Sequence, residues 1–181
     1  MSDASAQNVP AQIALDTRLV HAGRVGGTGP VNTPVHRAST ILFDTVVDLD
    51  AAKAARFAKG TLFYGRFGTP DTFAFEEAVS ALEAGAATVA VPSGLAACVL
   101  PLVAFLRPGD HVLVADTIYE PTRTSLNAFI ARNGVAVEYV DPRADLAPLL
   151  RPETRMIYLE SPGSLTFELQ DLPAVPALAQ C

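Results

Sequence analysis

The sequence is poor in the residues that hold metals and disulfides. It contains three histidines, two cysteines and no tryptophan. Cys98 and Cys181 lie far apart and the histidines are scattered, so the chain has neither a disulfide framework nor the close ligand spacing of a zinc site. Scarce cysteine is typical of a reduced, cytoplasmic protein, which is the location we expect. We expect no bound metal.

Excess positive charge and long apolar runs are also lacking. The net charge is −6 and no basic patch occurs, which argues against a nucleic-acid partner. No apolar run reaches the roughly 20 residues that a membrane-spanning helix needs, so we expect no membrane partner. The opening stretch, MSDASAQNVPAQ, has neither the basic start nor the apolar stretch of a secretory signal.

The sequence does contain a regular alternation of apolar segments. Half of its residues are hydrophobic, and from residue 87 onward short runs rich in β-branched residues alternate with helical stretches. This alternation predicts an α/β fold, in which helices cover both faces of a parallel sheet. The expected strands are 87–91, 111–115, 135–140 and 155–160, and the expected helices are 93–106, 119–133 with Gly134 as its C-cap residue, and 145–150.

The region before residue 87 has a less regular pattern. Its expected elements are a mobile arm (1–16), an extended loop (23–40), a short strand (41–46), a helix over 50–58 capped by Asp48, and a helix that begins at Pro70 after Thr69 and ends at Gly85. At the other end, LPAVPALAQC (172–181) has the pattern of a helix start without a stop. We therefore expect the sequence to be truncated.

Four candidate sites follow the ends of the expected strands: Ser93-Gly94, Asp116–Tyr119, Asp141 and Glu160–Ser164. The carboxyl ends of parallel strands meet at one edge of the sheet, where ligands of α/β proteins bind. We expect a ligand site at this edge.

The segment VPSGLAA joins an apolar strand pattern to an apolar helix pattern. A helix N-terminus offers backbone N–H groups and a partial positive charge, which suits a phosphate group. Gly94 lets an anion approach the backbone, and Ser93 can donate a hydroxyl. The alternative is an ordinary capped helix, since neither a Walker loop nor a GxGxxG fingerprint is present.

Two further motifs carry aromatic and basic side chains. Tyr119 in DTIYEPT follows a strand and can stack on a flat ligand, or it can simply pack on its helix. Tyr64 and Arg66 in LFYGRFGTP point the same way if the segment is extended, and together they could clamp a phosphate. The alternative is an exposed loop arginine beside a surface tyrosine.

The sequence resembles the Cys/Met-metabolism family of pyridoxal-phosphate (PLP) enzymes, and within it the cystathionine β-lyase branch. The resemblance rests on four motifs and on their order along the chain: YGR, SGLAA, YEPT and ESPGSLTFE. The resemblance implies a truncated type I PLP-dependent transferase fold. Residues 1–60 would form an N-terminal arm and helix that wrap a partner, and residues 61–181 the first part of the PLP-binding large domain. The C-terminal small domain would be absent.

The resemblance also implies roles for single residues. The N–H groups of Gly94 and Leu95, with the flanking Ser93, would hold the cofactor phosphate. Tyr119 would stack on the pyridine ring and assist proton transfer. Tyr64 and Arg66 would reach the phosphate of a neighbouring subunit in a homotetramer built as a dimer of dimers.

The implied reaction is β-elimination of cystathionine, a sulfur amino acid, to homocysteine, pyruvate and ammonia. Its Schiff-base lysine would lie beyond residue 181, whereas the two lysines present, Lys53 and Lys59, precede the phosphate loop. We therefore expect this chain alone to be inactive. The alternatives are a γ-lyase or γ-synthase of the family, a non-catalytic cofactor-binding or subunit-pairing protein, and an unrelated nucleotide-binding domain; Gly163-Ser164-Leu165 favours the β-lyase branch over the γ branches.

Overall fold

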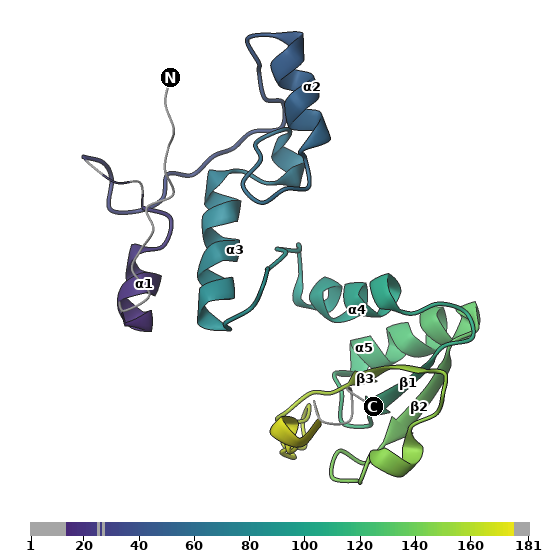
Figure 1. The fold of residues 1–181 in the computed structure, drawn as a ribbon. Helices are drawn as coiled ribbons and strands as arrows, with labels where there is room; N and C mark the ends of the chain where they lie inside the picture. Colours follow the sequence, from purple (N-terminus) through teal and green to yellow (C-terminus); the bar gives the residue numbers. More distant parts are fainter. Residues whose placement is uncertain (1–13, 25, 27, 176–181) are drawn as a thin grey trace. The chain divides into compact units, whose positions relative to one another are not determined.

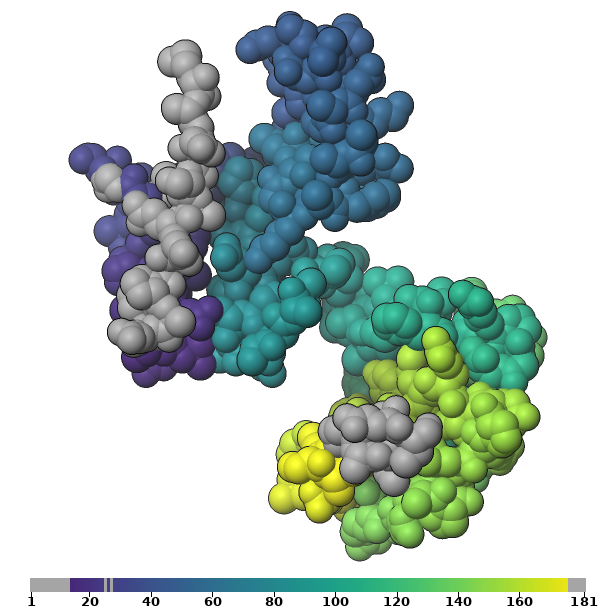
Figure 2. All heavy atoms as spheres, in the orientation of Figure 1, coloured from purple at the N-terminus to yellow at the C-terminus, as the bar shows by residue number. Residues whose placement is uncertain are grey.

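The structure is a computed structural model that describes residues 14–24, 26 and 28–175. The chain forms two compact units, Met1–Ala90 and Val91–Cys181. The first is coloured purple to teal and the second teal to yellow (Figures 1 and 2). The division into an arm with its helix (1–60) and a part of the large domain (61–181) stays a prediction. Among the described residues, no helix is both long enough and apolar enough to cross a membrane.

The second unit contains a parallel sheet of three strands, as its alternating pattern predicts. β1 (His111–Ala115) lies in the centre between β2 (Ala136–Val140) and β3 (Thr154–Tyr158). All five residues of β1 are buried. An apolar strand without alternation is typical of a parallel strand that is covered on both faces.

Helices cover one face of this sheet. They are α4 (Gly94–Phe105) and α5 (Glu120–Ser125), which continues as the π-helical η2 (Leu126–Ile130) and the 3-10 helix η3 (Ala131–Asn133). Leu102 of α4 packs with Val112 and Val114 of β1 in the larger core cluster. Gly134 follows at φ 84°, which confirms the predicted left-handed C-cap.

The other face of the sheet is covered by fewer residues and by a shorter helix. Leu113 packs there with Val140 and Leu146, beside the short η4 (Ala147–Leu149), which replaces the predicted helix over 145–150. The last described element is η5 (Leu172–Ala174), and most of the predicted C-terminal helix lies outside the described residues.

The strand predicted at 87–91 is wrong. Residues 87–91 form no ladder, and the Ala90 N–H instead donates to Glu76 Oε1 at 2.8 Å, while the hydroxyls of Thr88 and Ser80 lie 2.8 Å apart. A β-branched run becomes a strand only where a neighbour pairs with it. Side chains of the preceding helix bind this segment instead.

The first unit contains α1 (Leu15–His21), α2 (Val46–Ala54), η1 (Gly65–Phe67) and α3 (Pro70–Leu82). The start of α3 at Pro70 confirms the prediction, although the helix ends before Gly85. The strand predicted at 41–46 is wrong, and so is Asp48 as the cap. Thr45 caps α2: its Oγ1 accepts the Asp48 N–H at 3.1 Å and donates to the Asp48 carboxylate at 2.6 Å. This local capping outweighs the β-propensity of the valines. Most of the predicted arm, residues 1–13, lies outside the described residues.

A buried imidazole lies at the amino end of the sheet. His111 is 1% exposed, and its Nδ1 lies 2.8 Å from Thr154 Oγ1. Its Nε2 lies 3.3 Å from Glu138 Oε2, and Glu138 also accepts a hydrogen bond from Arg151. Burial lowers the pKa of His111 and the positive charge of Arg151 lowers it further, while Glu138 opposes both.

We expect the second unit to lose stability as the pH falls through about 6.5, the ordinary histidine value. With the pKa of His111 lowered in the fold, the unfolded chain binds a proton that the folded chain does not, so acid favours unfolding. Urea unfolding measured between pH 5 and 8 checks this. His111→Asn should flatten the dependence, whereas the exposed His21→Gln should not. An unchanged profile in His111→Asn contradicts the expectation.

Candidate functional site

The first turn of α4 presents unpaired backbone donors. Ser93 is the N-cap residue, and its Oγ accepts the Ala96 N–H at 3.2 Å, while its carbonyl accepts the Ala97 N–H at 3.0 Å. Within the described residues, no acceptor is recorded for the N–H groups of Gly94 and Leu95. A Cβ on Gly94 would meet nothing within 4 Å, so the space beside this turn is open.

This turn lies at the carboxyl edge of the sheet. α4 leads through the turn at residues 107–110 directly into β1, so helix and strand run in opposite directions (Figure 1). The twelve residues of α4 span about 18 Å and the five of β1 about 17 Å. The N-terminus of α4 therefore reaches the edge where β1 ends.

Tyr119 occupies the same edge. It follows β1 as the N-cap residue of α5, and its side chain is 46% exposed. Its N–H donates to Glu160 Oε2 at 2.9 Å. Glu160 follows β3, the neighbour of β1, so two of the predicted strand-end sites are joined directly. The sequence pattern places Glu160 at a strand end but contains no signal for this bond.

The segment from Glu160 to Ser164 packs against the turn between β1 and α5. The Ser164 N–H donates to the Thr117 carbonyl at 2.7 Å. A Cβ on Gly163 would lie 2.7 Å from the Thr117 side chain, closer than real Cβ atoms approach. Glycine is therefore required at position 163 for the segment to pack against Thr117. This packing holds the turn between β1 and α5, which carries Tyr119.

Asp141, at the end of β2, is engaged elsewhere. The Arg143 guanidinium donates to both of its carboxylate oxygens at 3.1 Å, and these hydrogen bonds hold the pKa of Asp141 below its usual value. A carboxylate paired in this way is a poor acid or base near neutral pH. The structure does not join Asp141 to Tyr119 or to the first turn of α4.

Tyr64 and Arg66 lie in the first unit. The extended conformation predicted for them is wrong at Arg66, because Gly65–Phe67 form the 3-10 helix η1. A Cβ on Gly65 would lie 1.9 Å from the Ala38 carbonyl oxygen, so glycine allows residues 38–40 to pack against the turn. The two side chains still meet, since the Arg66 guanidinium lies 5.4 Å from the centre of the Tyr64 ring.

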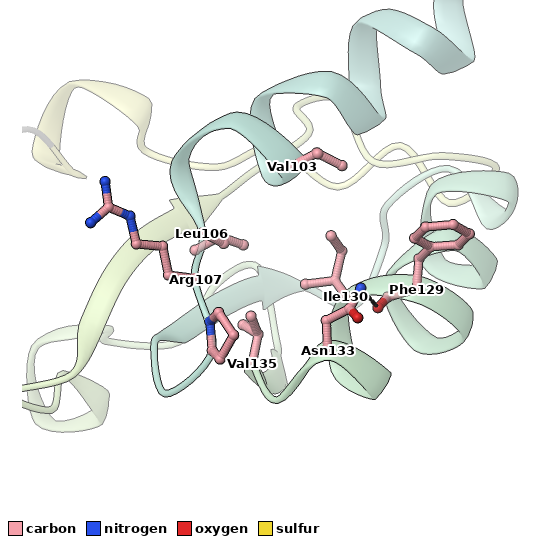
Figure 3. A pocket seen from close by; sticks show the side chains of 8 residues that line it. Val103, Leu106, Arg107, Phe129, Ile130, Asn133 and Val135 are labelled. Carbon is pink, nitrogen blue, oxygen red and sulfur yellow. Dashed lines mark hydrogen bonds between the residues drawn. The ribbon is translucent and has the colours of Figure 1, made fainter.

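A hollow of about 150 Å³ lies at the other end of α4. Val103, Leu106, Phe129 and Ile130 line it, together with other residues of the α4–β1 turn and the end of the α5 helix (Figure 3). Its lining is mainly apolar, so it does not suit a phosphate. This hollow is separate from the candidate site at the carboxyl edge.

Comparisons with known proteins agree with this arrangement. Residues 16–181 match the family described as Cys/Met metabolism PLP-dependent enzyme. The chain is 42% identical over 167 residues to cystathionine beta-lyase MetC of Escherichia coli, covering 90% of this chain and 42% of that protein. It is 41% identical over 167 residues to cystathionine beta-lyase of Salmonella typhimurium, covering 89% of this chain and 42% of that protein.

Solved structures give the same family. The crystal structure of cystathionine gamma-lyase from Lactobacillus plantarum complexed with L-serine matches with a TM-score of 0.77 and 29% identity, over 93% of this chain and 42% of that one. The chain thus spans less than half the length of the relatives that it matches. Its α/β fold is that of part of the PLP-dependent lyases, and the chain belongs to the Cys/Met metabolism PLP-dependent enzyme family.

Proposed function

We propose that these residues form the cofactor-phosphate half of a PLP-dependent carbon–sulfur lyase, which acts on cystathionine by β-elimination. The observation that carries the proposal is the first turn of α4. Two N–H groups without an acceptor among the described residues, those of Gly94 and Leu95, lie at the carboxyl edge of the sheet, and the space beside Gly94 is open. The half-exposed ring of Tyr119 follows β1 at the same edge.

The donors at this turn fit a phosphate group. Gly94 and Leu95 can each donate an N–H, and the helix adds its partial positive charge. The Ser93 oxygen already accepts the Ala96 N–H, which leaves its hydroxyl proton to donate to the ligand. Nothing at Gly94 blocks the approach of an anion. The turn thus offers three donors in a short stretch of chain.

Tyr119 would orient the flat ring of the cofactor. Stacking of the phenol on the pyridine would set the ring plane, and Glu160 would hold the Tyr119 backbone through its 2.9 Å hydrogen bond. When bound, PLP supplies an electron sink for the charge that develops at the substrate Cα. The phenol of Tyr119 could then exchange a proton with the substrate amine.

A bound phosphate carries nearly two negative charges, and Ser93, Gly94 and Leu95 carry none. We propose that the second source of positive charge is Arg66 of a neighbouring copy, positioned by Tyr64, in a dimer of dimers. The pairing of Tyr64, the N-cap residue of η1, with Arg66 supports a preformed clamp. β-Elimination rather than γ chemistry is proposed from the 41–42% identity to two β-lyases and from the segment Gly163-Ser164-Leu165 in ESPGSLTFE. A cytoplasmic location stays a prediction.

We expect Tyr119→Ala to weaken the binding of pyridoxamine 5′-phosphate about 2- to 10-fold, since an aromatic stack contributes about 0.5–1.5 kcal/mol. This ligand lacks the aldehyde that reacts with surface amines. Isothermal titration calorimetry measures the affinity, and Tyr119→Phe is the matched control that keeps the ring. Equal affinities of the unsubstituted chain and Tyr119→Ala would show that the ring does not stack on the ligand.

A further inference from the structure

α4 has few directional contacts that could fix its position. Its sequence, GLAACVLPLVAF, contains no charged side chain, and apolar packing alone does not set a helix at one point along its axis. In the described part of the chain, one hydrogen bond is recorded between α4 and the sheet. The Tyr158 phenol, at the end of β3, donates to the Cys98 carbonyl at 3.3 Å.

A proline divides α4 just after this contact. Pro101 has no N–H, so the Ala97 carbonyl lacks its usual donor within the helix. The turn that begins at Gly94 is therefore joined to the rest of α4 by a weakened hydrogen-bond ladder. Cys98 lies between that first turn and Pro101, so the external hydrogen bond is made on the same side of the proline as the first turn.

The surroundings of the Tyr158 phenol keep it a donor. Burial raises the pKa of Tyr158 far above its ordinary value, and the hydrogen bond to the Cys98 carbonyl raises it further. The phenol therefore keeps its proton throughout the neutral range. The fully buried Thr122 hydroxyl of α5 lies beside it, so β3, α4 and α5 meet at this one group.

We propose that Tyr158 is a positioning residue for the phosphate site. Its hydrogen bond to the Cys98 carbonyl fixes the first turn of α4, so that the N–H groups of Gly94 and Leu95 point together at the phosphate. The inference rests on the proposed function for its ligand. It assigns a task to a side chain that does not itself touch the cofactor.

The variant Tyr158→Phe tests this proposal, with Tyr139→Phe as the matched control. Tyr139 is also a strand tyrosine, but its hydroxyl donates to Asn127 Oδ1 at 2.9 Å and not to α4. We expect Tyr158→Phe to bind pyridoxamine 5′-phosphate about 3- to 10-fold more weakly, the effect of one hydrogen bond. Binding of pyridoxamine, which lacks the phosphate, should not change. Tyr139→Phe should leave both affinities unchanged.

Two results of this titration would overturn the proposal. One is unchanged binding of pyridoxamine 5′-phosphate by Tyr158→Phe. The other is an equal loss for pyridoxamine, which would indicate general damage rather than a misplaced phosphate site. Circular dichroism and thermal unfolding establish that both variants are folded.

Amide hydrogen exchange in the ligand-free chain tests the same proposal independently. Tyr158→Phe should speed exchange at Ala97, Cys98 and Val99, before Pro101, about 3- to 10-fold, and should leave Val103–Phe105 unchanged. Equal exchange in the two chains would contradict the role of Tyr158. If the unsubstituted chain does not bind pyridoxamine 5′-phosphate, the proposed function fails, and exchange still decides whether Tyr158 holds the turn.

Discussion

Gly94→Pro is expected to weaken binding of pyridoxamine 5′-phosphate about 10- to 100-fold without unfolding the chain. Gly94 is the first residue of α4, and proline is well tolerated at the first helical position. Ser93 has φ −158° and ψ 158°, an extended conformation that a following proline accepts. The substitution therefore removes one N–H donor and leaves the helix. Loss of a hydrogen bond to a charged group costs about 1.5–3 kcal/mol.

Gly94→Ala is the control for this experiment. It keeps the N–H, and its Cβ would meet nothing within 4 Å in the chain, so the two variants separate the lost donor from the added bulk. Calorimetric titration of both variants measures the difference, and circular dichroism checks the helix. If Gly94→Pro binds as tightly as Gly94→Ala, the Gly94 N–H does not hold the phosphate.

The second large effect is an absence of turnover. Supplied with PLP and cystathionine, a preparation of these 181 residues is expected to release pyruvate no faster than free PLP does. The chemistry needs a lysine activated by burial in an apolar pocket or by a neighbouring cation. The two lysines of the chain, Lys53 in α2 and Lys59 beyond its end, are both exposed.

Pyruvate release is followed with a coupled dehydrogenase assay. The Escherichia coli relative, a cystathionine beta-lyase, serves as the positive control. Intact mass must establish that the preparation contains only these residues. If pyruvate release is seen and persists in the double variant Lys53→Arg, Lys59→Arg, another group does the work of the lysine. If the double variant abolishes the release, the activity belongs to Lys53 or Lys59. Either result contradicts the expectation.

The sequence predicts those features of the second unit that depend only on neighbouring residues in the chain. The four apolar residues of β1 (residues 112–115), the Ser93 cap and the left-handed Gly134 each follow from nearby sequence, and each is found as expected. The strand predicted at 87–91 fails because a strand depends on a partner that the sequence pattern does not name. There the Glu76 side chain binds the Ala90 N–H instead.

The candidate site shows the same limit. Motifs identify Ser93, Gly94 and Tyr119 because their chemistry is local. The bond from Tyr119 to Glu160 and the bond from Tyr158 to Cys98 span 41 and 60 residues. Such contacts depend on strand order, and β3 lies beside β1 although β2 comes between them in sequence. Sequence spacing alone does not reveal that order.

Titration of the isotope-labelled chain with pyridoxamine 5′-phosphate, followed through the backbone amide resonances, tests directly whether the N-terminus of α4 holds the phosphate. The N–H signals of Gly94 and Leu95 are expected to move most, with smaller shifts around Tyr119. Pyridoxamine, which lacks the phosphate, is expected not to move the signals of Gly94 and Leu95. If the largest shifts fall elsewhere, or if Gly94 and Leu95 do not respond, the N-terminus of α4 is not the phosphate site.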